Sequence, residues 1–308
     1  MDPPELDPTE FANAIANYNP ELRDFFSATA ADFANYTSIT QGEVGDCWLL
    51  APIAALSRSP QLRQILRRNF TINDEDKTYT IKLYSAGKAN SVDINGNLYI
   101  LPADGRNKSD LLFAGQQQFL PEKATVKLAS TWFAFIEKAV AVMVEGYHLL
   151  DGGDPDSDTA KQADLGFKIL TDKPVTTYMI DDETDFSGKI AALLRAGAAI
   201  VFTTKANTEI ADERAMKIAP DEEDSSGFNL LEDHAYVVDS ISRDGSVQLY
   251  NPHGEIPKIR DQNRAAKLSE EDARYFGKRL DILPGNSGGS RKTRRHRTTS
   301  LKNRRTLS

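Results

Sequence analysis

The sequence predicts an α+β protein whose N-terminal half is mostly helical with a small sheet and whose C-terminal half is mostly β. Three observations carry this prediction. The stretches 47–56 and 131–147 are apolar enough, and suitably spaced, for core helices. Period-two alternation at 79–101, and the runs HAYVVDSI and VQLYN near 234–251, predict strands. A loop rich in Gly, Pro and Asp at 151–158 is the best boundary between the halves.

The N-terminal half is predicted to start irregularly and then to form helices around a small sheet. Residues 1–40 are expected to be a lead-in with short helical pieces, such as Pro8–Tyr18. The expected elements after it are a buried helix at Cys47–Leu56, a more exposed helix at Gln61–Asn69, strands within Tyr79–Leu101 with turn residues Asn95 and Gly96, and a core helix at Thr131–Tyr147.

The C-terminal half is predicted to hold a helix at Gly188–Gly197, a strand at Ala198–Lys205, and two strands joined through Asp244 and Gly245. From Gly285 the composition turns to Gly, Ser, Thr and Arg, which is typical of disorder. We therefore expect four parts: a lead-in (1–35), a helical subdomain (36–153), a β-rich subdomain (154–284) and a disordered basic tail (285–308).

Length and charge limit the classes of function. With 308 residues, 40% of them hydrophobic, the chain can bury a sizeable core, which excludes a peptide and a disordered chain. The formal net charge of −8 argues against a body built to coat nucleic acid. The tail from Arg291 to Arg305 is basic, and its candidate roles are a nucleic-acid arm, a nuclear address or a tether to acidic partners.

Nothing in the sequence predicts a membrane span or a secretory leader. The start, MDPPELDPTE, is acidic and proline-rich, and no apolar run approaches the ~20 residues that a bilayer span needs. We therefore expect an intracellular, cytoplasmic protein.

The single cysteine, Cys47, cannot form an intrachain disulfide, so it is either a small buried apolar residue or a nucleophile. In QGEVGDCW, Gly42 and Gly45 allow a tight backbone just before the predicted helix. Cys47 would then lie in the first helical turn, where unpaired N–H groups and the helix dipole lower the pKa of a thiol. This position favours the nucleophile.

A thiolate nucleophile needs a base, and four histidines are candidates. His148 and His296 are expected to be solvated or structural. His234 opens a predicted strand, and His253 lies in a turn two residues after Asn251. A hairpin between the two strands would bring the Asn251 amide to His234 and orient its imidazole.

The segment QGEVGDCWLLAPIAALS closely resembles the active-site signature of the calpain family of cysteine proteases. Three further segments resemble that family in order and rough spacing: WFAFIEKAVAVMVEGYHLLDGG, DHAYVV and LYNPHGE. The resemblance covers about residues 36–283. It implies a papain-like cysteine protease core, with the active-site cleft between a helical and a β-rich subdomain.

The resemblance also implies roles for individual residues. Cys47 would be the nucleophile, His234 the general acid and base, and Asn251 the residue that orients His234. Gln41 would give its side-chain amide to the oxyanion hole. The implied reaction is cleavage of polypeptide substrates through an acyl-thioester, which needs no cofactor.

Several residues depart from the family's pattern. Asp233 stands where the family has Gly before the catalytic His, and a carboxylate there would raise the pKa of His234. His253 replaces a Trp. Calpains are usually calcium-activated, but the stretch 36–40 before the signature has no carboxylate. The acids at 154, 156 and 158 begin like an EF-hand, yet Thr159 and Leu165 stand where Gly and Glu are required. We therefore expect no cofactor, and the sequence does not support a calcium requirement.

Two alternatives stay open at this point. In the first, the fold is kept without proteolysis, as a regulatory or binding protein whose cleft Asp233 blocks. In the second, the same Cys-His-Asn chemistry serves an acyl transferase, such as a transglutaminase or deamidase.

Overall fold

The computed structural model describes residues 21–42, 44–101, 110–111, 114, 131–152, 161–182, 185–206, 230–252 and 265–285, and every structural statement below concerns these residues. Several predictions fall outside them. These are the helical pieces at 8–18, the acids at 154–158, His253, His296 and the basic tail.

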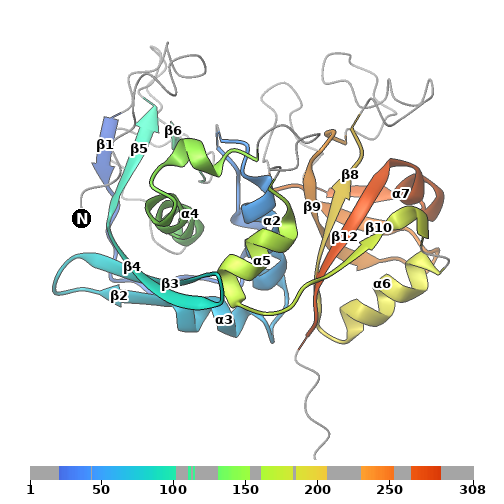
Figure 1. Ribbon diagram of the computed structural model, residues 1–308, viewed down its shortest axis with the longest axis horizontal. Coiled ribbons are helices and arrows are strands. Elements are labelled where there is room, and N and C mark those ends of the chain that lie inside the picture. Colours follow the sequence, from blue (N-terminus) through green and yellow to red (C-terminus); the bar gives the residue numbers. More distant parts are fainter. Residues whose placement is uncertain are drawn as a thin grey trace, which may run out of the picture.

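The first half of the chain builds helices and two three-stranded sheets, in the orders β1-β5-β6 and β2-β3-β4. Figure 1 shows α4 beside these sheets and α2 towards the middle of the molecule. The elements are β1 (Glu21–Asp24), η1 (Tyr36–Ser38), α2 (Cys47–Arg58), α3 (Arg63–Asn69), β2 (Phe70–Asn73), β3 (Thr78–Ser85), β4 (Lys88–Asn95), β5 (Asn97–Leu101), β6 (Asp110–Leu111), α4 (Trp132–Met143) and η3 (Tyr147–Leu150).

The second half builds one antiparallel six-stranded sheet, in the order β11-β10-β9-β8-β12-β7. It forms the right-hand part of Figure 1, with α6 and α7 packed on it. The elements are α5 (Ala163–Thr171), β7 (Thr176–Met179), η4 (Ile180–Asp182), α6 (Phe186–Arg195), β8 (Ala199–Thr204), β9 (Ala235–Ile241), β10 (Val247–Tyr250), β11 (Ala265–Leu268), α7 (Glu270–Phe276) and β12 (Gly277–Leu283).

Both faces of the six-stranded sheet are covered at its centre, which explains the continuous apolar runs 199–202 in β8 and 235–238 in β9. Val201 and Val237 belong to the same core as α2 and α4. Their neighbours Phe202 and Tyr236 point to the opposite face, into a second core with α6 and α7. Helix α2 contacts β8 and β9 directly, so it lies between the N-terminal sheets and the six-stranded sheet.

Hydrogen bonds between distant segments hold the chain before α2 against the six-stranded sheet. The Tyr250 hydroxyl lies 2.9 Å from the carbonyl oxygens of both Thr37 and Ile39. The Tyr36 hydroxyl (2.7 Å) and the Arg58 guanidinium (2.9 Å) both donate to Asp239 in β9. The position of the first turn of α2 is therefore tied to the strands that follow His234.

Helix α2 is buried almost all round, and α5 packs unusually close to it. Pro52 inside the helix has no N–H to give to the carbonyl of Trp48, four residues earlier. Gly166 of α5 lies against that same carbonyl, in a space where a Cβ atom would overlap the oxygen and lie 2.8 Å from Pro52 Cγ. The absence of a side chain at 166 is what lets the two helices approach.

Most predicted elements are confirmed. Helix α2 begins at Cys47, and α3, α4, α6, β8, β9 and β10 match their predicted stretches within a few residues. Asn95 and Gly96 do not close a hairpin, because β4 pairs with β3 while β5 pairs with β1 and β6. No sequence pattern predicted β1, β2, β6, α5, β7, β11, α7 or β12. The predicted boundary near 153 stays a prediction, although α5, which follows it, packs on α2.

Within the described ranges, no helix has the length and apolar character needed to cross a membrane.

Replacing Gly166 by Ala tests the close approach of α5 to α2. We expect Gly166→Ala to lower the free energy of unfolding by about 1–3 kcal/mol, because overpacking against backbone outweighs the gain in helix propensity. Urea unfolding followed by circular dichroism measures it. Leu165→Ala on the same helix, where the side chain is 37% exposed, is the control and should change little. An unchanged midpoint for Gly166→Ala would contradict the packing described here.

Candidate active site

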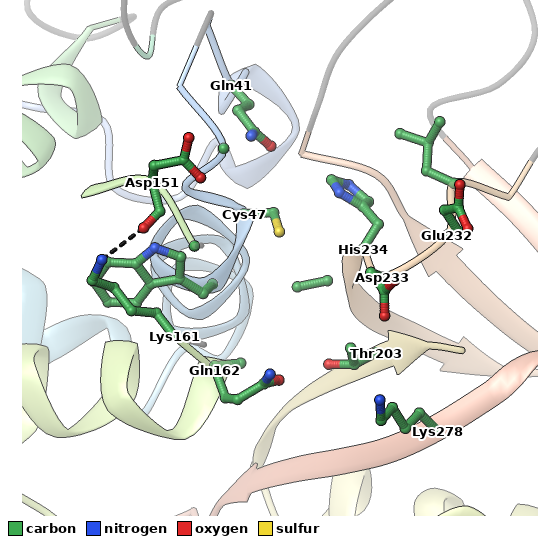
Figure 2. A pocket seen from close by; sticks show the side chains of 16 residues that line it. Gln41, Cys47, Asp151, Lys161, Gln162, Thr203, Glu232, Asp233, His234 and Lys278 are labelled. Atoms are coloured by element: carbon green, nitrogen blue, oxygen red, sulfur yellow. Dashed lines mark hydrogen bonds between the residues drawn. The ribbon is translucent and has the colours of Figure 1, made fainter. Parts of the chain in front are cut away.

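A cleft of about 380 Å³ opens at the N-terminus of α2. Cys47, the first residue of α2, lines it together with Gln41, Trp48 and His234. Figure 2 shows the Cys47 sulfur and the His234 ring directed into the same space, from α2 on one side and from the start of β9 on the other. The fold thus brings together two residues that are far apart in the sequence.

His234 is held by hydrogen bonds and by an aromatic contact. It is only 5% exposed, and its Nε2 lies 2.8 Å from the Asn251 side-chain oxygen. Because Oδ1 only accepts, Nε2 carries the proton of this bond, and Nδ1 is the nitrogen that can gain or lose one. The edge of the Tyr236 ring supports the imidazole at a centroid distance of 4.9 Å. The proximity predicted from the β9–β10 hairpin is therefore confirmed.

Asp233, directly before His234, adopts a left-handed backbone conformation with φ of 44°. Glycine takes this conformation without strain, and Asp and Asn are among the residues that tolerate it best. Asp233 lines the cleft. The structure therefore accounts for a Gly at this position in the calpain pattern and shows how Asp233 replaces it. Its effect on the pKa of His234 stays a prediction.

Gln41 lies in the cleft, six residues before Cys47, and is 4% exposed. Its side-chain nitrogen donates to the carbonyl oxygen of Val44 at 2.7 Å, which leaves one N–H of the same amide for another acceptor. Its main-chain N–H donates to the carbonyl of Pro252 at 2.6 Å, next to Asn251. One contact thus joins the loop before Cys47 to the segment that orients His234.

The electrostatic surroundings of Cys47 differ from the prediction. Burial raises the pKa of the Cys47 thiol to about 11. The backbone N–H of Ala235, and to a smaller extent those of Trp48 and Cys47 at the helix N-terminus, lower that pKa, while the charge of Asp46 raises it. The expectation that the helix N-terminus by itself lowers the pKa of the thiol below its usual value is wrong, because burial outweighs the N–H groups there.

Trp48 is buried, as expected for a residue with a packing role. Its indole N–H donates to the carbonyl of Leu150 at 2.7 Å. The Lys161 ammonium lies over its ring, 5.8 Å from the centroid, and donates to the carbonyl of Asp151.

Other cleft residues were missed by sequence reasoning. Lys161, Gln162, Thr203 and Lys278 also line it, and Figure 2 shows Lys278 directed towards it from β12. None of them belongs to a recognisable motif, and α5 and β12 were not predicted as elements. Only knowledge of how the two halves dock could have found them.

The described part of the chain holds no group of three or more His, Cys, Asp or Glu side chains arranged to bind a metal ion. The groups that converge in the cleft are a thiol, an amide-oriented imidazole and an amide donor. Together they can carry out nucleophilic acyl transfer, in which a thiolate attacks a carbonyl and an imidazole moves the proton.

A family model described as "calpain family cysteine protease" matches residues 20–260, more than three quarters of the chain. That range contains all four predicted site residues.

Among curated proteins, the chain is similar to the calpain-2 catalytic subunit of Gallus gallus. The two are 26% identical over 237 residues, which is 72% of this chain and 29% of the relative. The chain therefore corresponds to less than a third of the relative's length.

The raised thiol pKa gives a test of His234. With His234 facing it, we expect Cys47 to react with iodoacetamide faster than a free thiol near pH 6, because the imidazole takes the thiol proton. In His234→Ala no imidazole can take the thiol proton, and alkylation near pH 6 should fall to the rate of a free thiol or below it, because burial raises the pKa of the thiol. The measurement is the alkylation rate against pH.

His148→Ala is the matched control, since His148 lies in η3 and does not line the cleft. It should leave the profile unchanged. An unchanged profile for His234→Ala as well would show that His234 does not govern the thiol.

Proposed function

Because the chain belongs to the calpain family of cysteine proteases, we propose that it is an endopeptidase that cleaves polypeptides through Cys47, His234 and Asn251. The observation that carries the proposal is the convergence of the Cys47 sulfur and the Asn251-bound His234 in one cleft. Cys47 is the single cysteine of the sequence, so no other thiol could take this role.

In the proposed mechanism the thiol proton passes to His234, and the Cys47 sulfur attacks the scissile carbonyl. The imidazolium then protonates the departing amine, and the acyl group stays on sulfur as a thioester. Water, deprotonated by His234, releases the acid. Since the surroundings of Cys47, with burial as the largest cause, raise the pKa of the thiol to about 11, the transfer depends on the imidazolium as the partner of the thiolate.

Asn251 has the role of holding the ring in place. Its Oδ1 accepts a hydrogen bond from Nε2–H, so Nδ1 is the nitrogen that exchanges a proton with sulfur and substrate. This bond strengthens when the ring becomes cationic, because charge-assisted hydrogen bonds are the stronger ones.

Gln41 supplies an oxyanion donor in the same proposal. One N–H of its side chain donates to the Val44 carbonyl, and because the residue lines the cleft, the second N–H is the candidate donor. The negative charge that develops on the carbonyl oxygen during attack needs such donors, and removing one costs about 3 kcal/mol in comparable sites.

Peptide cleavage is the direct test. Incubated with an unfolded protein, the purified chain should produce new peptide N-termini, and Cys47→Ala should lower the rate by at least about 1000-fold. Mass spectrometry of the products distinguishes the alternatives. Ammonia release or crosslinks without new termini would identify a transferase instead.

Cys47→Ser is the matched variant, since it keeps the shape and loses the reactive sulfur. It should be as inactive as Cys47→Ala. If the Cys47→Ala chain still cuts, the site is misassigned. If neither wild type nor variant cuts while Cys47 alkylates as slowly as a free thiol, the chain is a binding protein with a silent cleft.

Cleavage should not require calcium. The segment before Cys47 is tied to the six-stranded sheet by bonds between protein groups, from Tyr250 to Thr37 and Ile39 and from Gln41 to Pro252. We therefore expect the same cleavage rate with a chelator as with added calcium, and magnesium chloride at equal ionic strength is the salt control. Loss of activity in chelator that calcium alone restores would contradict this.

A further inference from the structure

Two buried carboxyl groups behind Cys47 have no part in the proposed mechanism. Asp46 is fully buried and Glu137 of α4 is 1% exposed. Asp46 directly precedes the nucleophile, and its carbonyl accepts the N–H groups of Leu49 and Leu50, which begins α2. Interactions of the Asp46 side chain therefore also affect the position of the first turn of α2.

Hydrogen bonding at this pair cannot be satisfied by two ionised carboxylates. Both Glu137 oxygens accept the N–H of Ala114, at 3.1 and 3.0 Å. Neither Asp46 oxygen receives an N–H or O–H from another described residue, apart from its contact with the Glu137 carboxyl. Two carboxylates can only accept, so this contact becomes a hydrogen bond only when one of them keeps a proton.

No cation among the described residues neutralises the pair. Lys138, next to Glu137 in α4, instead donates to the main-chain and side-chain oxygens of Asn95 and to the Asn97 carbonyl. The other titratable groups that face the pair are acidic or phenolic: Asp151 after η3, Tyr147 in η3, which in turn faces Tyr99 of β5, and the Cys47 thiol itself. Desolvation accordingly raises the pKa of Asp46 to about 7 and that of Glu137 well above its usual value.

We propose that Asp46 and Glu137 share one proton at neutral pH and form a positioning pair that controls how much negative charge lies beside Cys47. The proton joins the loop that carries the nucleophile to α4. Its position also sets the charge next to the sulfur, since the Asp46 carboxylate disfavours the Cys47 thiolate. The inference rests on the proposed function only in taking that thiolate as the reacting species.

Two isosteric variants keep one negative charge at the pair and change only which of the two residues carries it. In Glu137→Gln the new amide can donate to Asp46 and accept from Ala114, so the negative charge is confined to Asp46, next to Cys47. In Asp46→Asn the amide donates to Glu137, so the charge is confined to α4. Each variant keeps a hydrogen bond and one negative charge.

The test is the alkylation rate of Cys47 against pH in both variants. We expect the thiol of Asp46→Asn to titrate about 0.5–1 unit lower than that of Glu137→Gln, which makes alkylation of Asp46→Asn about three to ten times faster at a fixed pH below both midpoints. A purely structural pair would not shift the two profiles in opposite directions. Coincident profiles would overturn the proposal.

An infrared measurement gives an independent result should either variant fail to fold. The wild-type chain at pH 7 to 8 should show the band of a buried protonated carboxyl, and the band should vanish in each folded variant. Asp151→Asn, which removes a neighbouring acid outside the pair, should keep it. A wild-type chain without the band would refute the shared proton. Neither readout needs peptide cleavage, so failure here is distinguishable from failure of the proposed function.

Discussion

Burial of helix α2 is the constraint on which the rest of the structure depends. Ten of its residues, from Trp48 to Ser57, are buried, with sheets on both sides. The packing of α2 fixes Cys47 at the N-terminal end of the helix, with its sulfur directed towards the start of β9 (Figure 2). The same surroundings make ionisation of the thiol unfavourable, because desolvation outweighs the backbone N–H groups that lower its pKa. The fixed position of Cys47 thus makes its thiol harder to ionise. In the proposed mechanism the His234 imidazole offsets this by taking the thiol proton.

The alignment of the two sides of the cleft depends on a few long-range hydrogen bonds near its rim. Tyr250 and Asn251 are neighbours at the end of β10, where one holds the segment 37–39 and the other holds His234. The next residue, Pro252, accepts the N–H of Gln41. Of these three consecutive residues, the first and the third contact the segment before Cys47, and the second contacts His234. A displacement of this strand end would change the distance between the Cys47 sulfur and the imidazole and move Gln41 together with it.

Sequence patterns predicted the elements whose signal is local and the site residues that belong to motifs. The apolar run after Cys47 and the turn residues Asp244 and Gly245 were enough to place α2 and the β9–β10 hairpin, and hence the His234–Asn251 bond. Tertiary pairing decided the rest. β5 pairs with β1 across a long separation, which Asn95 and Gly96 could not reveal. The raised pKa of the thiol depends on how completely the surrounding chain excludes water, a quantity that the helix position alone does not contain.

The left-handed backbone at Asp233 has a consequence for compounds aimed at the cleft. A residue with a side chain costs about 1 kcal/mol of conformational free energy in this region relative to glycine. The protein therefore keeps a carboxylate at the rim of the cleft at a cost in stability. That carboxylate occupies room on the β9 side that a bare backbone would leave open. Covalent inhibitors shaped for a relative with glycine there would be expected to fit poorly, whereas slender electrophiles bearing an amine on that side would gain a counter-charge. An inhibitor could thus distinguish this protein from such relatives by the side chain at position 233.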